Sequence, residues 1–124
     1  MATQRADFSR AVEKNASDFG LELSDAQLTL LADYYELLMK WNARLHLVAP
    51  CPPEEFAIRH VLESLWLLRH LSPGADVLDV GSGGGLPIIP CLLIREDLRA
   101  TLIESSKRKT IFLQIGRASC RERV

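Results

Sequence analysis

The first 45 residues show the spacing of apolar residues that is typical of helices. From Ser24 onward, apolar residues recur at steps of three and four, which lays one apolar stripe along a long helix. Ser24 and Gln27 match a capping box at its start. The stripe consists of Leu28, Leu31, Tyr34, Tyr35, Leu38, Trp41 and Leu45. We therefore interpret its aromatic residues as core and not as platforms for stacking bases.

Two further helices are predicted on either side of this one. A weaker helical pattern covers residues 7–19 and ends at Gly20. A third helix follows the prolines at positions 50, 52 and 53, and a Ser-Pro-Gly sequence at 72–74 ends it. Its apolar positions again keep the helical period: Phe56, Val61, Leu62, Leu65 and Leu68.

After residue 74 the pattern changes to strand, glycine loop, helix, strand and helix. The corresponding segments are 76–80, 81–85, 87–94, 100–104 and 107 onward. Two strands joined by a helix predict one right-handed βαβ unit at the beginning of a parallel sheet. The expected fold class is therefore α/β, with a helical segment 1–74 followed by an α/β segment 75–114.

Composition adds limits on the class of protein. The chain has 124 residues, of which 48% are hydrophobic and 25% charged, as expected for one globular domain. No run of eighteen apolar residues is present and the N-terminus is polar, so we expect a cytoplasmic protein without a membrane segment. The cysteines and histidines lack the spacing of disulfide frameworks or metal ligands, and no metal is predicted; they are Cys51, Cys91, Cys120, His46, His60 and His70.

The last ten residues, 115–124, resemble the translation of a sequencing-adapter oligonucleotide, and we interpret them as a foreign scar that interrupts the last helix. They carry a net charge of +2, so the formal charge changes from −1 for the whole chain to −3 without them. A nucleic-acid-binding domain is usually basic. Any contact with RNA must therefore come from a local patch.

The glycine loop carries the strongest chemical signal. Glycines after a strand let the backbone turn tightly and approach a ligand, and the following helix N-terminus favours a negative group such as the carboxylate of S-adenosylmethionine. The pattern G-x-G-x-G, at Gly81, Gly83 and Gly85, follows the acidic Asp79 and differs from the dinucleotide fingerprint, in which a small residue stands where this chain has Leu86. No Gly-Lys-Ser/Thr of a phosphate-binding loop is present.

Glu104 is the second part of this signal. It lies 23 positions beyond Gly81, at the end of the next strand, where it can accept hydrogen bonds from ribose hydroxyls. The pattern favours a methyltransferase. A nicotinamide-binding oxidoreductase and a non-catalytic interaction module remain as alternatives.

Several segments together resemble a known family. The sequences Val-Leu-Asp-Val-Gly-Ser-Gly-Gly-Gly-Leu-Pro (77–87) and Leu-Ile-Glu-Ser (102–105) are similar to the glucose-inhibited division protein B family of small-subunit ribosomal RNA guanine-N7 methyltransferases. Arg-Lys at 108–109, Phe-Leu at 112–113, Leu-Leu-x-x-Trp-Asn at 37–42 and Arg-His-x-x-x-Ser-Leu at 59–65 agree with it. Ile88, in place of a glycine, and Glu63, in place of an aspartate, depart from the family pattern.

The resemblance implies a Rossmann-like class I methyltransferase domain that uses S-adenosylmethionine. It implies cofactor contacts at Gly81 and Leu86, with Gly83, Gly85, Asp79 and Glu104 close by. The expected partner is small-subunit (16S) ribosomal RNA. We expect the chain to be an N-terminal fragment that is inactive by itself, of a protein that is monomeric at full length.

Three residues are candidates for RNA contact. His60 shares one helix face with Glu63 and Ser64, and the resemblance implies that this face lies near the substrate opening, although spacing alone favours a solvated pair. Arg108 and Lys109, which follow Lys107, either bind RNA phosphates or form a solvated helix start. Guanine N7 carries a free lone pair, so no proton must be removed before methyl transfer, and no catalytic residue is named.

Overall fold

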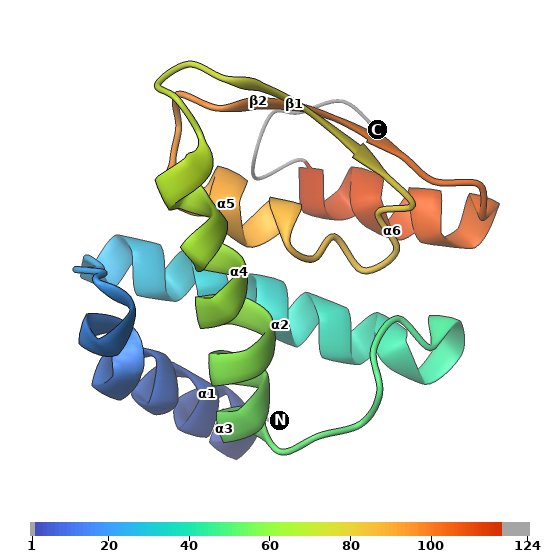
Figure 1. The fold of residues 1–124 in the computed structure, drawn as a ribbon. Helices are drawn as coiled ribbons and strands as arrows, with labels where there is room; N and C mark the ends of the chain where they lie inside the picture. Colours follow the sequence, from blue (N-terminus) through green and yellow to red (C-terminus); the bar gives the residue numbers. More distant parts are fainter. Residues whose placement is uncertain (1, 118–124) are drawn as a thin grey trace.

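The computed structural model describes residues 2–117, in which a helical part lies against a small α/β part (Figure 1). The helical part begins with α1 (Ala2–Asn15), the 3-10 turn η1 (Ala16–Phe19) and α2 (Asp25–Leu45). A single helical rod follows, in which α-helical, π-helical, α-helical and 3-10 segments succeed one another. They are α3 (Pro53–Glu55), η2 (Phe56–Leu62), α4 (Glu63–Leu65) and η3 (Trp66–His70). The α/β part consists of β1 (Asp76–Val80), α5 (Ile88–Ile94), β2 (Arg99–Ile103) and α6 (Lys107–Arg117).

The start of α2 confirms the predicted capping box. The Ser24 hydroxyl accepts a hydrogen bond from the Gln27 backbone N–H at 3.1 Å, and the Gln27 side chain accepts one from the Ser24 N–H at 2.9 Å. Gly20 ends η1 in the left-handed conformation that glycine adopts without strain, with φ +70°. The two helix boundaries that local chemistry encodes were therefore correctly predicted.

The first helix is longer than predicted, because tertiary contacts stabilise its polar beginning. It starts at Ala2, whereas the pattern predicts a start at residue 7. Arg5 pairs with the carboxylates of Asp33 and Glu36 on α2, and Phe8 stacks on Tyr35 with ring centroids 4.4 Å apart. Neither contact can be read from the spacing within the first helix.

The helical rod 53–70 covers the predicted third helix, but its pitch is not uniform. Residues 56–62 have π-helical hydrogen bonding and residues 66–70 are 3-10. Phe56, Val61, Leu62 and Leu65 are buried as the period predicts. Periodicity therefore identified the buried face but not the change of pitch.

The two strands pair in parallel over five residues, from Asp76 opposite Arg99 to Val80 opposite Ile103. The first strand has the predicted bounds, and the second begins at Arg99 and ends at Ile103, one position earlier at each end than predicted. In Figure 1, α5 and α6 lie between this sheet and α2. The described residues therefore form a sheet, a layer of two short helices, and the helical part beneath them.

Within residues 2–117, the structure covers one face of the sheet and leaves the other open. Alternate residues point inward, and Leu102 is buried at 3% exposure. On the outer face Leu78, Val80 and Ile103 are 62%, 71% and 49% exposed. This face therefore presents apolar side chains on the surface of the described residues.

Candidate functional site

The glycine loop leaves the end of β1 and is fixed to the end of β2. The Ile103 carbonyl accepts hydrogen bonds from the backbone N–H groups of Gly81, at 2.7 Å, and Ser82, at 3.3 Å. The Gly85 N–H donates to the Ser82 carbonyl at 2.7 Å. These bonds close a tight turn at the edge where both parallel strands end, which is where ligands bind in open α/β sheets.

The conformation of the loop requires glycine at three positions. Gly81, Gly83 and Gly85 have φ values of +75°, +54° and +84°, in the left-handed region. At Gly85 there is a second reason, since a Cβ would stand 2.5 Å from the Ile89 Cδ1 atom. At Gly81 a Cβ would meet nothing within 4 Å, so there is open space beside this residue.

Glu104 lies in direct contact with the loop. One of its carboxylate oxygens accepts a hydrogen bond from the Gly83 N–H at 2.8 Å, and the other accepts one from the Ser106 N–H at 2.9 Å. These bonds, first that of Ser106 and then that of Gly83, hold the pKa of Glu104 below its usual value of 4.5. The structure therefore brings together the two features that the sequence predicts to form one site, with an ionised carboxylate at its centre.

Asp79 contributes a second acidic group on the covered face of β1. Its Oδ2 atom is buried and has no hydrogen-bond partner among the described residues. Its backbone carbonyl accepts a hydrogen bond from the Ser82 hydroxyl at 3.2 Å. A buried polar atom without a partner destabilises a protein, so such an oxygen indicates a missing donor.

The loop differs from the expected anion-binding turn in two respects. Helix α5 begins at Ile88, after Leu86 and Pro87, and has only seven residues. The backbone N–H groups of residues 81, 82, 83 and 85 all donate to acceptors within the protein. They are therefore not free to surround a carboxylate or a pyrophosphate, as the loops of phosphate-binding proteins do.

The three RNA-contact candidates lie in two places. His60 is on η2, where its ring centroid is 5.0 Å from that of Phe56, and its backbone carbonyl accepts a hydrogen bond from the Ser64 hydroxyl. No ion pair joins His60 to Glu63 within the part of the chain that the structure describes. Arg108 and Lys109 lie in the first turn of α6, where Arg108 is exposed and Lys109 is close enough to Glu104 to favour its charge. Contact with RNA stays a prediction for all three.

Pattern analysis did not predict one contact to the loop. Tyr34 on α2 is buried, as the apolar stripe predicts, and its hydroxyl donates a hydrogen bond to the Gly84 carbonyl at 2.6 Å. The two residues are 50 positions apart in the sequence. A glycine carbonyl carries no sequence signal, so this pairing could not be found from one sequence.

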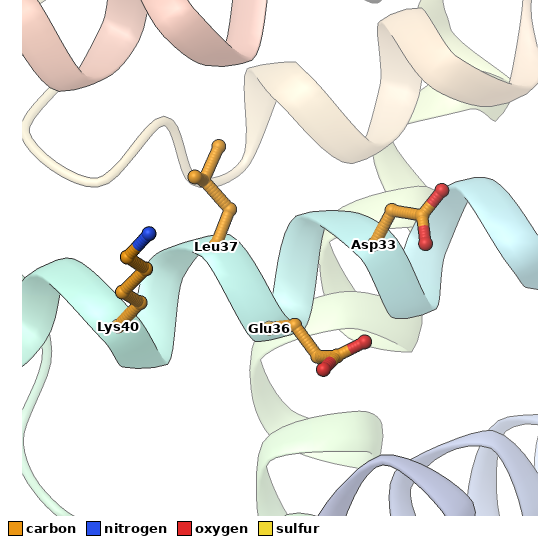
Figure 2. A pocket seen from close by; sticks show the side chains of 4 residues that line it. All are labelled: Asp33, Glu36, Leu37 and Lys40. Carbon is orange, nitrogen blue, oxygen red and sulfur yellow. The ribbon is translucent and has the colours of Figure 1, made fainter. Parts of the chain in front are cut away.

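A shallow hollow of about 420 Å³ lies elsewhere on α2, and Figure 2 shows its lining residues, Asp33, Glu36, Leu37 and Lys40. None of these is a predicted site residue. The two carboxylates are paired with Arg5, so the acidic groups of the hollow already have a cation. We therefore do not assign the chemistry of the glycine loop to it.

The described residues contain neither a membrane-spanning helix nor a group of metal ligands. None of the helices within residues 2–117 is long and apolar enough to cross a membrane. Within the same range, no three histidine, cysteine or acidic side chains are grouped so that they could hold a metal ion.

Comparison with known proteins places these features in a wider context. A family model described as rRNA small subunit methyltransferase G (GidB) matches residues 27–120. The protein named ribosomal RNA small subunit methyltransferase G of Chromobacterium violaceum is 42% identical over 103 residues, which are 83% of this chain and 49% of that protein. The proteins of the same name from Geobacter sulfurreducens and Neisseria meningitidis are 36% and 42% identical, over 83% and 77% of this chain and 48% and 46% of their own lengths. The chain spans about half the length of the curated relatives it matches.

Proposed function

The chain belongs to the rRNA small subunit methyltransferase G family, and on this premise we propose that residues 75–114 bind S-adenosylmethionine for methyl transfer to guanine N7 of small-subunit ribosomal RNA. The proposal includes the finer fold assignment, in which β1, α5 and β2 are the first unit of a Rossmann-like class I methyltransferase sheet. The names of the relatives support methyl transfer to small-subunit ribosomal RNA, and guanine N7 as the acceptor comes from the family resemblance. The same proposal places the protein in the cytoplasm, where its ribosomal RNA substrate would be.

The observation that carries the proposal is the hydrogen bond between Glu104 and the glycine loop. It fixes an ionised carboxylate beside Gly81 and Gly83, at the end of two parallel strands. A carboxylate accepts hydrogen bonds and donates none, so it suits the two hydroxyls of a ribose. The open space beside Gly81 lets a ligand approach the backbone closely.

The chemistry of the site fits S-adenosylmethionine better than a nicotinamide dinucleotide. The ligand carries a positive sulfonium and a positive amino group, and the site offers Glu104 together with the unpartnered oxygen of Asp79. A dinucleotide carries a pyrophosphate, which requires free backbone N–H groups, and four of those in the loop are already bonded within the protein. Leu86 occupies the place where dinucleotide folds need a small residue.

The proposed role of the chain in the reaction is binding and orientation. When bound, S-adenosylmethionine supplies the electrophilic methyl group. Guanine N7 already carries the lone pair that attacks, so the protein needs no general base, and we assign no catalytic residue. Glu104, Gly81, Gly83, Gly85, Leu86 and Asp79 would hold the cofactor, and His60, Arg108 and Lys109 would contact the RNA.

Calorimetric titration of the chain with S-adenosylmethionine tests the proposal, with NADH as the competing ligand. We expect binding of S-adenosylmethionine and none of NADH. In Asp79→Asn the shape is kept and an acceptor is lost, so we expect about tenfold weaker binding of the cofactor, the loss of roughly one charge-assisted hydrogen bond. Its melting temperature should change little, because one polar group replaces another of the same size at the buried position.

The other results would contradict the proposal. Binding of NADH alone would favour an oxidoreductase domain. Binding of neither ligand by a chain that melts cooperatively would favour an interaction module. A loss of affinity in Asp79→Asn that only follows a loss of folding would remove Asp79 from the site.

A further inference from the structure

The glycine loop is seated on the helical part of the protein through Gly84. The Gly84 carbonyl accepts the buried hydrogen bond from the Tyr34 hydroxyl at 2.6 Å. On the other side of the same residue, a Cβ would stand 3.1 Å from the Leu38 Cδ1 atom and 3.3 Å from the Leu47 Cβ atom. Gly84 therefore accepts a buried hydrogen bond and fits closely against two side chains, which would have to shift by a few tenths of an ångström to admit a methyl group.

The segment that carries Leu47 is itself fixed by Asn42. The Asn42 amide donates to the Val48 carbonyl at 3.1 Å and accepts from the Val48 N–H at 2.9 Å. Between them His46 has a left-handed backbone with φ +51°, and its N–H donates to the Asn42 carbonyl at 3.0 Å. These bonds turn the chain at the end of α2 so that Leu47 lies against Gly84.

We propose that Tyr34 is a positioning residue for the cofactor loop, which it holds in its binding conformation by the hydrogen bond to Gly84. This inference rests on the proposed function, because it assigns the loop to the cofactor. The residues that form the seat, Tyr34, Leu38 and Leu47 with Asn42 behind it, are all outside the α/β part. The seat accounts for part of the Leu-Leu-x-x-Trp-Asn segment at 37–42, which the proposed reaction by itself does not explain.

The physical reason is that the loop is ordered by backbone hydrogen bonds and gains little from packed side chains. Its four glycines have no side chains to pack, and glycine loses more conformational entropy on ordering than any other residue. Without the Tyr34 bond the ordered loop would be less populated. A ligand that binds only the ordered loop then binds more weakly, in proportion to that population.

Tyr35 provides a matched control on the same helix. It is as well buried as Tyr34, but its ring packs against Phe8 and Phe56, with centroids 4.4 and 5.2 Å away, in the helical core. Tyr34→Phe and Tyr35→Phe remove the same atom from adjacent positions. Only the first removes a contact with the glycine loop.

The experiment compares the two variants with the unaltered chain by three measurements: the melting temperature, the hydrogen exchange of the backbone at residues 81–87, and the dissociation constant for S-adenosylmethionine. In Tyr34→Phe we expect faster exchange in the loop and about three- to tenfold weaker binding, since a buried carbonyl loses its partner. In Tyr35→Phe we expect neither change, even where its melting temperature falls equally. A purely structural role would lower the melting temperatures without separating the two variants in exchange and affinity.

The outcomes distinguish this inference from the proposed function. If the unaltered chain does not bind S-adenosylmethionine, both are overturned. If it binds and the two variants have equal affinity and equal loop exchange, only the role of Tyr34 is overturned. If Tyr34→Phe does not fold, Asn42→Ala tests the same seat, and unchanged loop exchange and affinity in that variant would overturn the inference.

Discussion

Replacement of Gly81 by alanine separates the backbone requirement of the loop from its contact with a ligand. Gly81 has φ +75° and open space where a Cβ would stand. The added methyl group therefore meets no protein atom, and its effect on folding is limited to backbone strain. If a ligand lies in the open space, the same methyl group also blocks its approach.

The expected loss of stability and the expected loss of affinity can be estimated separately. The left-handed conformation destabilises an alanine by about 1–2 kcal/mol. The lower entropy of the unfolded chain offsets about 0.4–1 kcal/mol of this. The net loss is about 1 kcal/mol, which lowers the melting temperature of a domain of this size by roughly 4 °C. A methyl group in the ligand space should weaken binding more than tenfold, which corresponds to about 1.4 kcal/mol or more.

Gly74→Ala is the matched control, because Gly74 has φ +70° and also meets nothing within 4 Å. It lies in the turn before β1, away from the loop, where its N–H donates to the Asp97 carboxylate at 2.8 Å. We expect the melting temperature, measured by circular dichroism, to fall by the same amount in both variants. In calorimetric titration only Gly81→Ala should bind S-adenosylmethionine weakly. Equal affinity of the two variants would refute the assignment of the open space to the ligand.

Three further predictions follow from the environment of single side chains. Because the folded-state pKa of Glu104 is lowered, its ionised form stabilises the fold above the unfolded value of 4.5, and this stability is lost as the pH falls through the lowered pKa. The variant Glu104→Gln should therefore melt at a lower temperature than the unaltered chain at pH 7, and the difference should shrink below about pH 4. A difference that does not depend on pH would contradict this. Burial raises the pKa of the Cys91 thiol to about 12, so iodoacetamide at pH 8 should leave it unmodified in the folded chain and alkylate it in urea, as peptide mass spectrometry can check. Val80→Thr with Ile103→Thr should reduce binding of a hydrophobic dye while the free energy of unfolding changes by less than about 0.5 kcal/mol per site, whereas Leu102→Thr, at 3% exposure, should unfold the chain; dye binding that does not change would show that the outer face is not the exposed apolar surface.

Residues whose conformation is determined by their neighbours in sequence could be predicted. The capping box at Ser24, the end at Gly20 and the first strand agree with the pattern because hydrogen bonds within a few residues fix them. Helix α6 continues to Arg117, three residues into the segment that we interpret as a scar, and its helical backbone does not bear on where that segment comes from. Residues 118–124 lie outside the described part, and the origin of the segment 115–124 stays a prediction.

Features that depend on distant packing could not be predicted. The early start of α1 depends on Arg5 meeting the acidic side chains of α2, and the π-helical pitch of residues 56–62 is not visible in a pattern of apolar positions. The burial of Leu102 depends on which face of the sheet the helices cover. In each case the pattern of a segment does not reveal which distant residues pack against it.

In the candidate site, too, locally determined features could be predicted and features that depend on distant contacts could not. The glycines were found because left-handed backbone favours one residue type, and Glu104 because two strands of similar length bring their ends together. The expected anion-binding role of the loop was not supported, because four of its N–H groups already donate to Ile103, Glu104 and Ser82. A glycine motif identifies a backbone that can approach a ligand, but the acceptors already bonded to that backbone decide the charge of the ligand. Because four of the loop N–H groups are occupied and the Oδ2 atom of Asp79 lacks a partner among the described residues, we expect a ligand that donates hydrogen bonds and carries positive charge, as the amino and sulfonium groups of S-adenosylmethionine would.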